Sequence, residues 1–588
     1  MSEAKSKHLG SILLAALLLS SASPDAGALS FWDDVPNATL RERLLEAMTP
    51  QEVIAQTLML GWLGERPSAE IVEWLAETSL GGVKVFGWNG GNLVTLAETL
   101  GEMQGRASEH RLGIPLITAT DQEGGWVRHV KGRDDLTTSI TPGNMAIGAS
   151  SLPYDAYRSA YYIGMELRAL GINMNFAPTV DVYVNPEAHV IGPRAFSDDP
   201  VLTGVLGVAF YQGLEEARVI ATAKHFPGHG NAAEDSHGVL PVLDDSYDEL
   251  AGRDLVPYRF LVNEGVPAVL TGHLSFPNVS GDERPASLSP HFIHDLLRGT
   301  LGFRGLVITD DLYMGGAWEY GADHGWGIAE IVIEALRAGN DMVMLSRTPD
   351  LNGALTDRLV ELYNADPDFR ARVRDAAGRV LDLKLAYLKP TDRVPLEPDS
   401  DRLADSIRAQ GGASFFRDQA GRSVAVLRDA GLPLEIGSDE RILLAGKDLD
   451  FLRIGEELIP DADVYRIGSP RFVGTDARDR VSFRDAAARY DTVVFCLSDT
   501  STAEILAAAE GVEARIVIFS ILTPVYLSDL PWVESAIAVF GWGVESFRAG
   551  YSVLLGRVAP EGTSPLALRH ANEGENAEER NAPLPESD

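Results

Sequence analysis

The chain has 588 residues, of which 45% are hydrophobic, so it is long enough for two domains that each bury a core. Its formal net charge of −35 disfavours nucleic acid and anionic membrane surfaces as partners, because both repel an acidic protein. The one cysteine, Cys496, excludes an intrachain disulfide, and its apolar surroundings predict a small core residue.

The N-terminus has the pattern of a secretory signal peptide. Two lysines precede an apolar run at 12–19, which small residues follow, and this run is too short to span a bilayer. We therefore expect a signal peptide at 1–28, cleaved after Ser23 or Ala28, and export to the periplasm or the medium without stable membrane insertion afterwards. The alternative is an apolar leader or anchor, although no cysteine is present there for a lipid.

From about residue 40 to residue 388, helical patterns alternate with short apolar runs. These runs lie at 82–86, 115–119, 172–176, 219–223, 268–271, 306–309 and 342–345. Strands that alternate with helices indicate parallel βα units. Seven or eight such units over about 350 residues favour a TIM-like (β/α)8 barrel, with a doubly wound sheet as the alternative.

Polar side chains follow five of the runs. They are Asp121, Asp181, Lys224 with His225, His273, and Asp310. Because the carboxyl ends of barrel strands meet at one face, where the βα loops carry function, we expect one shared site there.

The richest of these segments is 224–237, which follows the run at 219–223. It holds three histidines, a lysine and two carboxylates around two glycines and a proline. One alternative is a metal site, but no histidine pair has the spacing of a zinc-binding helix, and Pro227 disfavours a helix. Another is a polar surface loop without a function. The density of ionisable groups favours a catalytic loop at the end of a strand.

Three motifs of this chain resemble those of a known family. Lys-His-Phe-Pro-Gly-His-Gly at 224–230, followed by Asp-Ser-His at 235–237, is similar to the signature of the β-N-acetylglucosaminidase branch of family 3 glycoside hydrolases. Asp-Gln-Glu-Gly-Gly at 121–125 and Thr-Asp-Asp-Leu-Tyr-Met at 309–314 match in the expected order. The resemblance covers 45–390 and continues more loosely to about residue 560. It implies a barrel followed by an α/β sandwich domain.

The resemblance also implies catalytic roles. Asp310, at the end of a strand, would be the nucleophile that attacks the oxocarbenium-like sugar, and Asp311 would be structural. The alternative is that Asp310 caps the following helix. His237 would donate the proton to the leaving group, since imidazole can give and take protons near neutrality. Asp235, two residues earlier, would orient this imidazole.

By the same resemblance, four residues bind the sugar: Asp121, Arg194, Lys224 and His225. For each of them the alternative is a buried salt bridge in the barrel mouth. Glu123, His229 and His273 match family positions as well, but we do not expect them to contact the ligand. No metal or organic cofactor is implied, because the Gly-Gly pairs lack a phosphate-binding or dinucleotide-binding pattern.

The second half of the chain again combines apolar runs with helical patterns. Beyond a helix predicted at 371–388, three prolines among charges mark a linker, and the acidic C-terminus has few apolar residues. The predicted organisation is a signal peptide at 1–28, a catalytic TIM-like barrel at 29–390, a linker at 391–420, an α/β sandwich domain at 421–565 and a disordered acidic tail at 566–588.

The sequence thus predicts an exported, retaining exo-β-N-acetylglucosaminidase that acts on short amino-sugar oligosaccharides from peptidoglycan or chitin. The first alternative is a β-N-acetylglucosaminide phosphorylase of the same fold. The second is a secreted, non-catalytic carbohydrate-binding protein, which the presence of Asp235, His237 and Asp310 together disfavours. A β-glucosidase is disfavoured because those relatives lack the Asp-Ser-His motif. The sequence does not indicate an oligomeric state.

Overall fold

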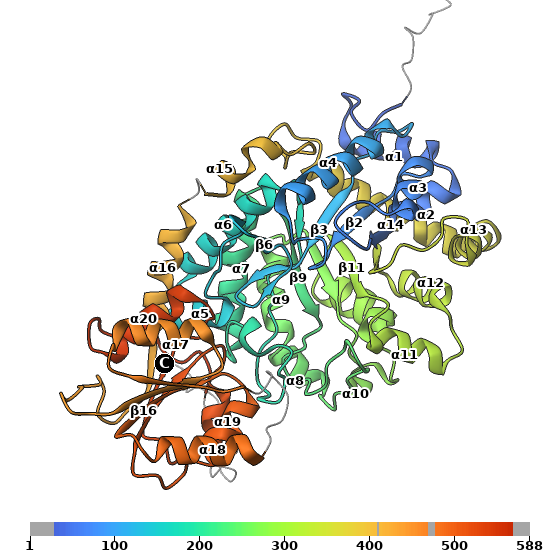
Figure 1. The fold of residues 1–588 in the computed structure, drawn as a ribbon. Helices are drawn as coiled ribbons and strands as arrows, with labels where there is room; N and C mark the ends of the chain where they lie inside the picture. The colour runs from blue at the N-terminus through green and yellow to red at the C-terminus, as the bar shows by residue number, and fades with distance from the viewer. Residues whose placement is uncertain (1–28, 409–410, 469–476, 568–588) are drawn as a thin grey trace, which may run out of the picture.

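The computed structural model describes residues 29–408, 411–468 and 477–567. Two bodies are visible in Figure 1, a large barrel built by the first two thirds of the chain and a smaller sheet domain built by the last third. The predicted signal peptide lies outside the described residues, as does the predicted acidic tail beyond residue 567. No helix in the described part of the chain combines the length and apolar character needed to cross a membrane.

Eight parallel strands close the barrel, in the order β1-β12-β11-β10-β9-β8-β3-β2. They are β1 (Leu58–Gly61), β2 (Gly82–Val85), β3 (Ile117–Thr120), β8 (Met174–Asn175), β9 (Ile220–Phe226), β10 (Ala268–Thr271), β11 (Leu306–Asp311) and β12 (Met342–Leu345). Because β1 pairs with both β2 and β12, the sheet has no edge. The TIM-like barrel is confirmed, and the doubly wound sheet is wrong.

Two strands differ from their predicted positions. β1 was missed, because its four apolar residues directly follow α2 (Pro50–Gln56) without a turn signal between them. β9 continues three residues beyond the predicted run and ends at Phe226. Lys224 and His225 therefore belong to a strand rather than to a loop, which fixes their side chains more firmly than a loop would.

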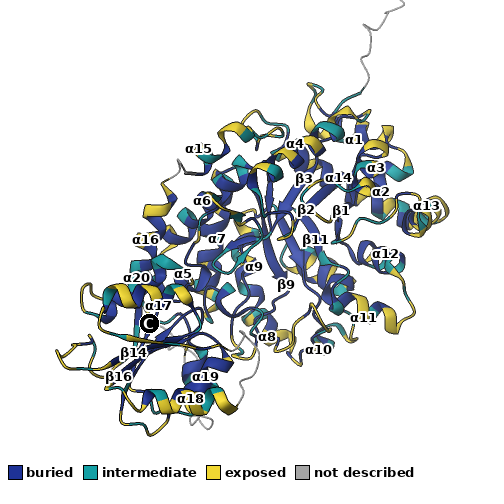
Figure 2. Cartoon of the chain, viewed as in Figure 1, coloured by how far each residue is buried: buried dark blue, intermediate teal, exposed yellow. Residues whose placement is uncertain are grey.

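Helices surround the barrel strands and place their apolar faces against them (Figure 2). The main ones are α3 (Ala69–Glu77), α4 (Leu93–Glu109), α6 (Pro153–Ala169), α7 (Pro200–Glu216), α9 (Leu255–Asn263), η3 (His291–Thr300), α12 (Ile328–Ala338), α13 (Ala354–Ala365) and α14 (Pro367–Tyr387). The helix predicted at 371–388 begins four residues earlier as α14, because Asp366 caps it by accepting the backbone N–H groups of Asp368 and Phe369. α14 packs against α1 (Asn37–Ala47) and α2.

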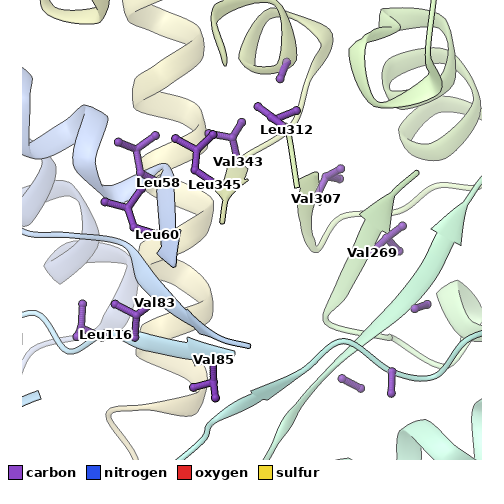
Figure 3. Packing of buried hydrophobic residues seen from close by; sticks show 14 of the residues in the cluster. Leu58, Leu60, Val83, Val85, Leu116, Val269, Val307, Leu312, Val343 and Leu345 are labelled. Atoms are coloured by element: carbon purple, nitrogen blue, oxygen red, sulfur yellow. The ribbon is translucent and has the colours of Figure 1, made fainter. Parts of the chain in front are cut away.

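Alternate residues of the barrel strands face the helices and the barrel interior. Leu58 and Leu60, like Val83 and Val85, belong to the core between strands and helices (Figure 3). The residues between them face inward, where a second apolar cluster, mainly methionine, isoleucine, leucine and alanine, fills the interior. Lys84, between Val83 and Val85, is fully buried and is thus an inward-facing cation.

The second domain is a six-stranded sheet in the order β13-β18-β17-β16-β14-β15, with only β13 antiparallel. Its strands are β13 (Ala425–Asp429), β14 (Ile442–Gly446), β15 (Asp463–Arg466), β16 (Thr492–Leu497), β17 (Arg515–Ser520) and β18 (Ser535–Ala538). One face packs against α17 (Leu449–Leu458) and α20 (Val544–Leu554), and the other against α18 (Ala477–Ala487) and α19 (Thr500–Ala507). This confirms the α/β sandwich, with Cys496 buried in β16 as predicted.

Short helices lie within the segment that we interpreted as a linker. They are η4 (Ser400–Arg402), α15 (Leu403–Arg408) and the start of α16 (Gly412–Ser423). α16 packs against α5 (Asn144–Ser150) of the barrel region and α20 of the second domain. The segment therefore fastens the two bodies together, while the boundaries that we drew around it stay predictions.

Candidate active site

The predicted site residues gather at the carboxyl ends of the barrel strands, because three of these strands end in or next to them. Lys224 and His225 lie near the end of β9, Asp310 lies near the end of β11, and Asp121 directly follows β3. Arg194 comes from a 3-10 turn, η1 (Gly192–Arg194), in the long segment between β8 and α7. Contacts connect Asp121, Lys224, Arg194 and His225 into one network, in which Glu123 joins Lys224 to Arg194.

Asp310 lies among three imidazoles and one ammonium group. Burial would raise the pKa of Asp310, but the surrounding imidazoles of His225, His273 and His237 and the Lys224 ammonium outweigh burial and lower it. Its Oδ1 accepts the backbone N–H of Asp311 at 2.8 Å. Asp310 is therefore ionised at neutral pH, which is the state that a nucleophilic carboxylate needs.

Asp311 has a different environment. Its Oδ1 accepts the backbone N–H groups of Ser346, after β12, at 2.9 Å and of Tyr313 at 3.2 Å. Burial raises the pKa of Asp311, in contrast to that of Asp310. Asp311 thus ties two neighbouring strand ends together, which agrees with the structural role that we expected for it.

His237 and Asp235 form a hydrogen-bonded pair on the loop that follows β9. The Nδ1 atom of His237 lies 2.7 Å from Oδ1 of Asp235, which also accepts the His237 backbone N–H at 2.9 Å. This bond raises the pKa of His237 and holds the pKa of Asp235 at about 2. About two thirds of the His237 side chain is exposed, so a substrate can reach it.

The same loop is fastened to the first residues of α11 (Gly315–Asp323), the helix that begins after the turn following Asp310. The backbone N–H of Gly315 donates to the carbonyl of His237 at 2.9 Å, and that of Gly316 donates to the carbonyl of Ser236 at 3.0 Å. A Cβ at Gly315 would lie only 2.3 Å from the Gly238 carbonyl oxygen, so the close approach of these two segments requires glycine. The predicted nucleophile and proton donor are therefore held on adjoining segments, and the charge of Asp310 contributes to the raised pKa of His237.

Two buried lysines hold the carboxylate of Asp121. Lys84 Nζ lies 2.7 Å from Oδ2, and Lys224 Nζ hydrogen-bonds Oδ1. Burial opposes ionisation of Asp121, but the charges of Lys224 and Lys84 keep its pKa well below the ordinary value. The partly exposed carboxylate of Asp121 can therefore accept hydrogen bonds from hydroxyl groups at the barrel mouth, while the two buried lysines hold it in place.

Arg194 makes a bidentate ion pair with Glu123, through Nε at 2.9 Å and Nη2 at 2.8 Å. Lys224 Nζ also lies 2.7 Å from Glu123, and together these cations overcome burial and hold the pKa of Glu123 at about 2. Arg194 Nη2 lies 3.1 Å from Nε2 of His225. Arg194 thus forms the salt bridge that we gave as the alternative to sugar binding. Sugar binding by Arg194 stays a prediction.

Asp181 is a buried carboxylate that holds His225 of this network in place. It contacts Nδ1 of His225 at 2.7 Å and accepts the backbone N–H groups of His225 at 3.2 Å and His229 at 2.7 Å. Three bonds to one buried carboxylate fix both the imidazole of His225 and the start of the loop that carries His237.

His229 and His273 support the site from inside the protein. Burial lowers the pKa of His229 to about 4, so its imidazole is neutral at neutral pH, with Nε2 3.1 Å from Oγ of Ser236. His273 contacts Oγ of Ser287 at 2.7 Å through Nδ1 and the carbonyl of Asp311 at 3.0 Å through Nε2. These contacts occupy both ring nitrogens of His273 and Nε2 of His229, whereas Nδ1 of His229 is buried without a hydrogen-bond partner among the described residues.

Sequence reasoning missed Lys84 and gave no role to Asp181. Lys84 lies inside a run that we interpreted simply as an apolar strand. A lysine in a buried strand needs a partner, and this requirement could have identified Lys84 from the sequence. Asp181 was recognised as a polar residue after a strand, but its bonds to backbone groups of β9 and of the following loop depend on the closed barrel.

The site holds a buried ionised carboxylate, a carboxylate-paired imidazole on an adjoining loop and a network of charged side chains at the mouth of a TIM barrel. This combination defines a glycoside hydrolase. Within the described ranges, no group of three or more histidine, cysteine, aspartate or glutamate side chains is arranged to hold a metal ion.

The chain belongs to glycosyl hydrolase family 3, because residues 40–383 match the family described as "Glycosyl hydrolase family 3 N terminal domain". It is 35% identical over 301 residues to a Beta-hexosaminidase of Xylella fastidiosa (strain M23), covering 51% of this chain and 86% of that relative. It is 34% identical over 328 residues to the Beta-hexosaminidase A of Pseudoalteromonas piscicida, but this match spans 51% of this chain and only 54% of that relative.

Solved structures also resemble the chain beyond the barrel. A glycoside hydrolase family 3 beta-N-acetylglucosaminidase from Paenibacillus sp. str. FPU-7 is 29% identical, with a TM-score of 0.76, over 89% of this chain and 100% of that one. The likeness therefore includes the second domain. The resemblance to the β-N-acetylglucosaminidase branch, inferred from three motifs, is confirmed.

Proposed function

We propose that this protein is a retaining exo-β-N-acetylglucosaminidase that releases terminal β-linked N-acetylglucosamine from short amino-sugar oligosaccharides. The observation that carries the proposal is the pair of adjoining segments that hold ionised Asp310 and the His237–Asp235 pair. The hexosaminidase and N-acetylglucosaminidase names of the relatives support the choice of sugar.

In this mechanism Asp310 attacks the anomeric carbon and forms a covalent glycosyl ester, while His237 gives its proton to the departing glycosidic oxygen. The Nδ1 atom faces Asp235, which leaves Nε2 as the atom that exchanges protons with the substrate. The neutral imidazole then takes a proton from water as the water attacks the ester, which returns free sugar and ionised Asp310. Two displacements at one carbon retain the β configuration.

Asp235 acts on this cycle through His237. The proton donor must carry a positive charge before it acts, and a carboxylate hydrogen-bonded to the opposite nitrogen stabilises that charge. The raised pKa of His237 supports this role, since a donor must hold its proton at the working pH.

The sugar is proposed to bind over the charged network of Asp121, Lys224, Arg194 and His225. The opposite charges in the network compensate one another, so the site has no large net electrostatic field. It still offers both hydrogen-bond acceptors and donors to hydroxyl groups. The N-terminal sequence pattern supports export to the periplasm or the medium, and peptidoglycan or chitin fragments are substrates that an exported enzyme would meet.

The test uses two substrates with the same aryl leaving group, an N-acetyl-β-glucosaminide and a β-glucoside, each with and without phosphate. We expect turnover of the N-acetylglucosaminide to dominate and to release free sugar. Preference for the glucoside would contradict the sugar assignment, and sugar 1-phosphate as the main product would favour the phosphorylase. A folded protein that turns over neither substrate would favour a carbohydrate-binding protein.

A further inference from the structure

An exposed tryptophan lies directly after β2, at the active-site end of the barrel. Trp88 is 47% exposed, although tryptophan is among the residues that proteins bury most. One face of its indole stacks on Phe86, with ring centroids 4.5 Å apart and planes 10° from parallel. Phe86 thus covers one face of the indole, and the other face is open to the ring of a ligand.

The indole is fixed in this orientation by hydrogen bonds around it. Trp88 Nε1 donates to the carbonyl of Trp62 at 2.8 Å. The side chain of Asn89 donates to the carbonyls of Trp62 at 3.2 Å and Gly64 at 2.6 Å, and it accepts the backbone N–H of Phe86 at 2.8 Å. A ring that is already held in place loses little conformational entropy when a ligand stacks on it.

The stack adjoins the sugar-binding network. The ring centroid of Phe86 lies 4.4 Å from Lys84 Nζ, which in turn lies 2.7 Å from Asp121. The ring of Phe86 is also 6.0 Å from that of His129, another neighbour of Asp121. Two side chains, Phe86 and Lys84, therefore separate Trp88 from Asp121, and Trp88 adjoins the network that would hold the terminal sugar.

Charged groups lie beside the turn that carries Trp88. Glu65, in the loop after β1, approaches Arg133 at 3.4 Å, and both side chains are about one third or more exposed. A Cβ at Gly91, in the same turn as Trp88, would lie 3.3 Å from Oε1 of Glu65, so this carboxylate covers the turn. An exposed aromatic ring, on a turn with a carboxylate and a guanidinium nearby, suits a pyranose, which has an apolar C–H face and hydroxyl groups at its edge.

We propose that Trp88 is the stacking platform for the leaving-group sugar, the unit on the reducing side of the bond that is cut. This inference rests on the proposed function, and it deepens that function by naming the residue that recognises the sugar of the leaving group. Glu65 and Arg133 would contact the hydroxyl groups of that second sugar.

The test compares two substrates that share the terminal sugar. One is β-1,4-linked N,N′-diacetylchitobiose, whose leaving group is a sugar, and the other is N-acetyl-β-glucosaminyl fluoride, whose leaving group is too small to stack. The measured quantity is the ratio of kcat/KM for the disaccharide to kcat/KM for the fluoride. Trp88→Ala should lower this ratio about tenfold, the size of one lost stacking contact. Trp88→Phe, which keeps an aromatic face, should lower it less.

Trp32→Ala is the matched control. Trp32 is 39% exposed, and its neighbour Phe31 pairs with Leu112, which precedes β3, so Trp32 lies at the opposite end of the barrel. This variant should leave the ratio as in the wild type. An unchanged ratio in Trp88→Ala would overturn the inference, and so would equal losses on both substrates, because Trp88 would then support the terminal-sugar pocket or the fold. A wild-type enzyme that cleaves neither substrate would overturn the proposed function and this inference with it.

Discussion

The Nδ1 atom of His237 lies 2.7 Å from Oδ1 of Asp235, and the same oxygen accepts the backbone N–H of His237 at 2.9 Å. One carboxylate oxygen thus fixes both the position of the residue and the direction of its ring. With Nδ1 directed to Asp235, the proton that the proposed mechanism transfers is the one on Nε2.

His237→Ala should affect substrates according to their leaving groups. General acid catalysis contributes about 10²–10⁴-fold, so cleavage of chitobiose should fall by that factor. A dinitrophenyl N-acetylglucosaminide needs no proton on its leaving group and should lose far less. Steady-state kinetics on both substrates measure the difference.

His291→Ala is a suitable control, because His291 is also paired with a carboxylate, Asp295 at 3.1 Å, but lies on η3. It should retain wild-type rates. Equal losses on both substrates in His237→Ala would mean that His237 shapes the site instead of donating a proton.

Asp235→Asn should move the alkaline limb of the pH profile to lower pH. The hydrogen bond with Asp235 is the main cause that raises the pKa of His237, and the imidazolium form is the proton donor. As pH rises through this pKa, His237 loses its proton and kcat/KM for chitobiose falls. Without the carboxylate the pKa drops, so the fall begins at lower pH.

The acid limb should stay where it is in this variant, because it reports Asp310, whose pKa lies below its ordinary value of 3.8. Profiles of kcat/KM against pH for the wild type and Asp235→Asn test both statements. An alkaline limb that does not move would assign it to another group.

Lys84→Met should reduce activity and stability together. Lys84 is fully buried and pairs with Asp121, and the variant leaves that carboxylate with Lys224 as its remaining lysine partner. Removing one partner of a buried ion pair costs about 3 kcal/mol, which would lower Tm. Because Asp121 also loses a group that orients it, kcat/KM should fall by roughly 10²-fold.

Lys131→Met, at an exposed lysine, is the control and should change neither Tm nor kcat/KM. Wild-type kinetics in Lys84→Met would show that the Asp121 network does not bind the sugar.

Phosphate should intercept part of the glycosyl intermediate. A carboxylate acting as the base would repel an anionic nucleophile, whereas a neutral or protonated imidazole does not. We expect some sugar 1-phosphate at high phosphate, beside free sugar as the main product. Product analysis by NMR at increasing phosphate measures the partition. Complete absence of the phosphate ester would show that the site excludes anions, and its dominance at millimolar phosphate would make the enzyme a phosphorylase.

The barrel could be predicted because its strands are buried runs separated by helical patterns, and the site could be predicted because strand ends carry polar residues. Asp310 and Lys224, for example, are polar residues near the ends of strands that were predicted as buried runs. β1 could not be predicted in the same way, since its four residues follow a helix without a turn signal. The helices within 391–420 were missed because prolines and charges dominate the pattern of that segment.

The contacts inside the site could not be predicted, because they depend on how the barrel closes. Asp121 follows β3 and pairs with Lys84 of β2 and Lys224 of β9, which are 37 and 103 positions away in the chain. No local pattern encodes such pairings. The loop that carries His237 was recognised from its residues, but its attachment to the first residues of α11 is a property of the folded chain.

The central claim is that Asp310 forms a covalent bond with the sugar, and trapping tests it most directly. A fluorinated N-acetylglucosaminyl donor that slows breakdown of the intermediate should inactivate the enzyme and add one sugar mass. Peptide mass spectrometry should then place the label on Asp310, and Asp310→Asn should remain unlabelled. A label on Asp311 or Glu319 instead, or turnover in Asp310→Asn at the wild-type rate, would contradict the account.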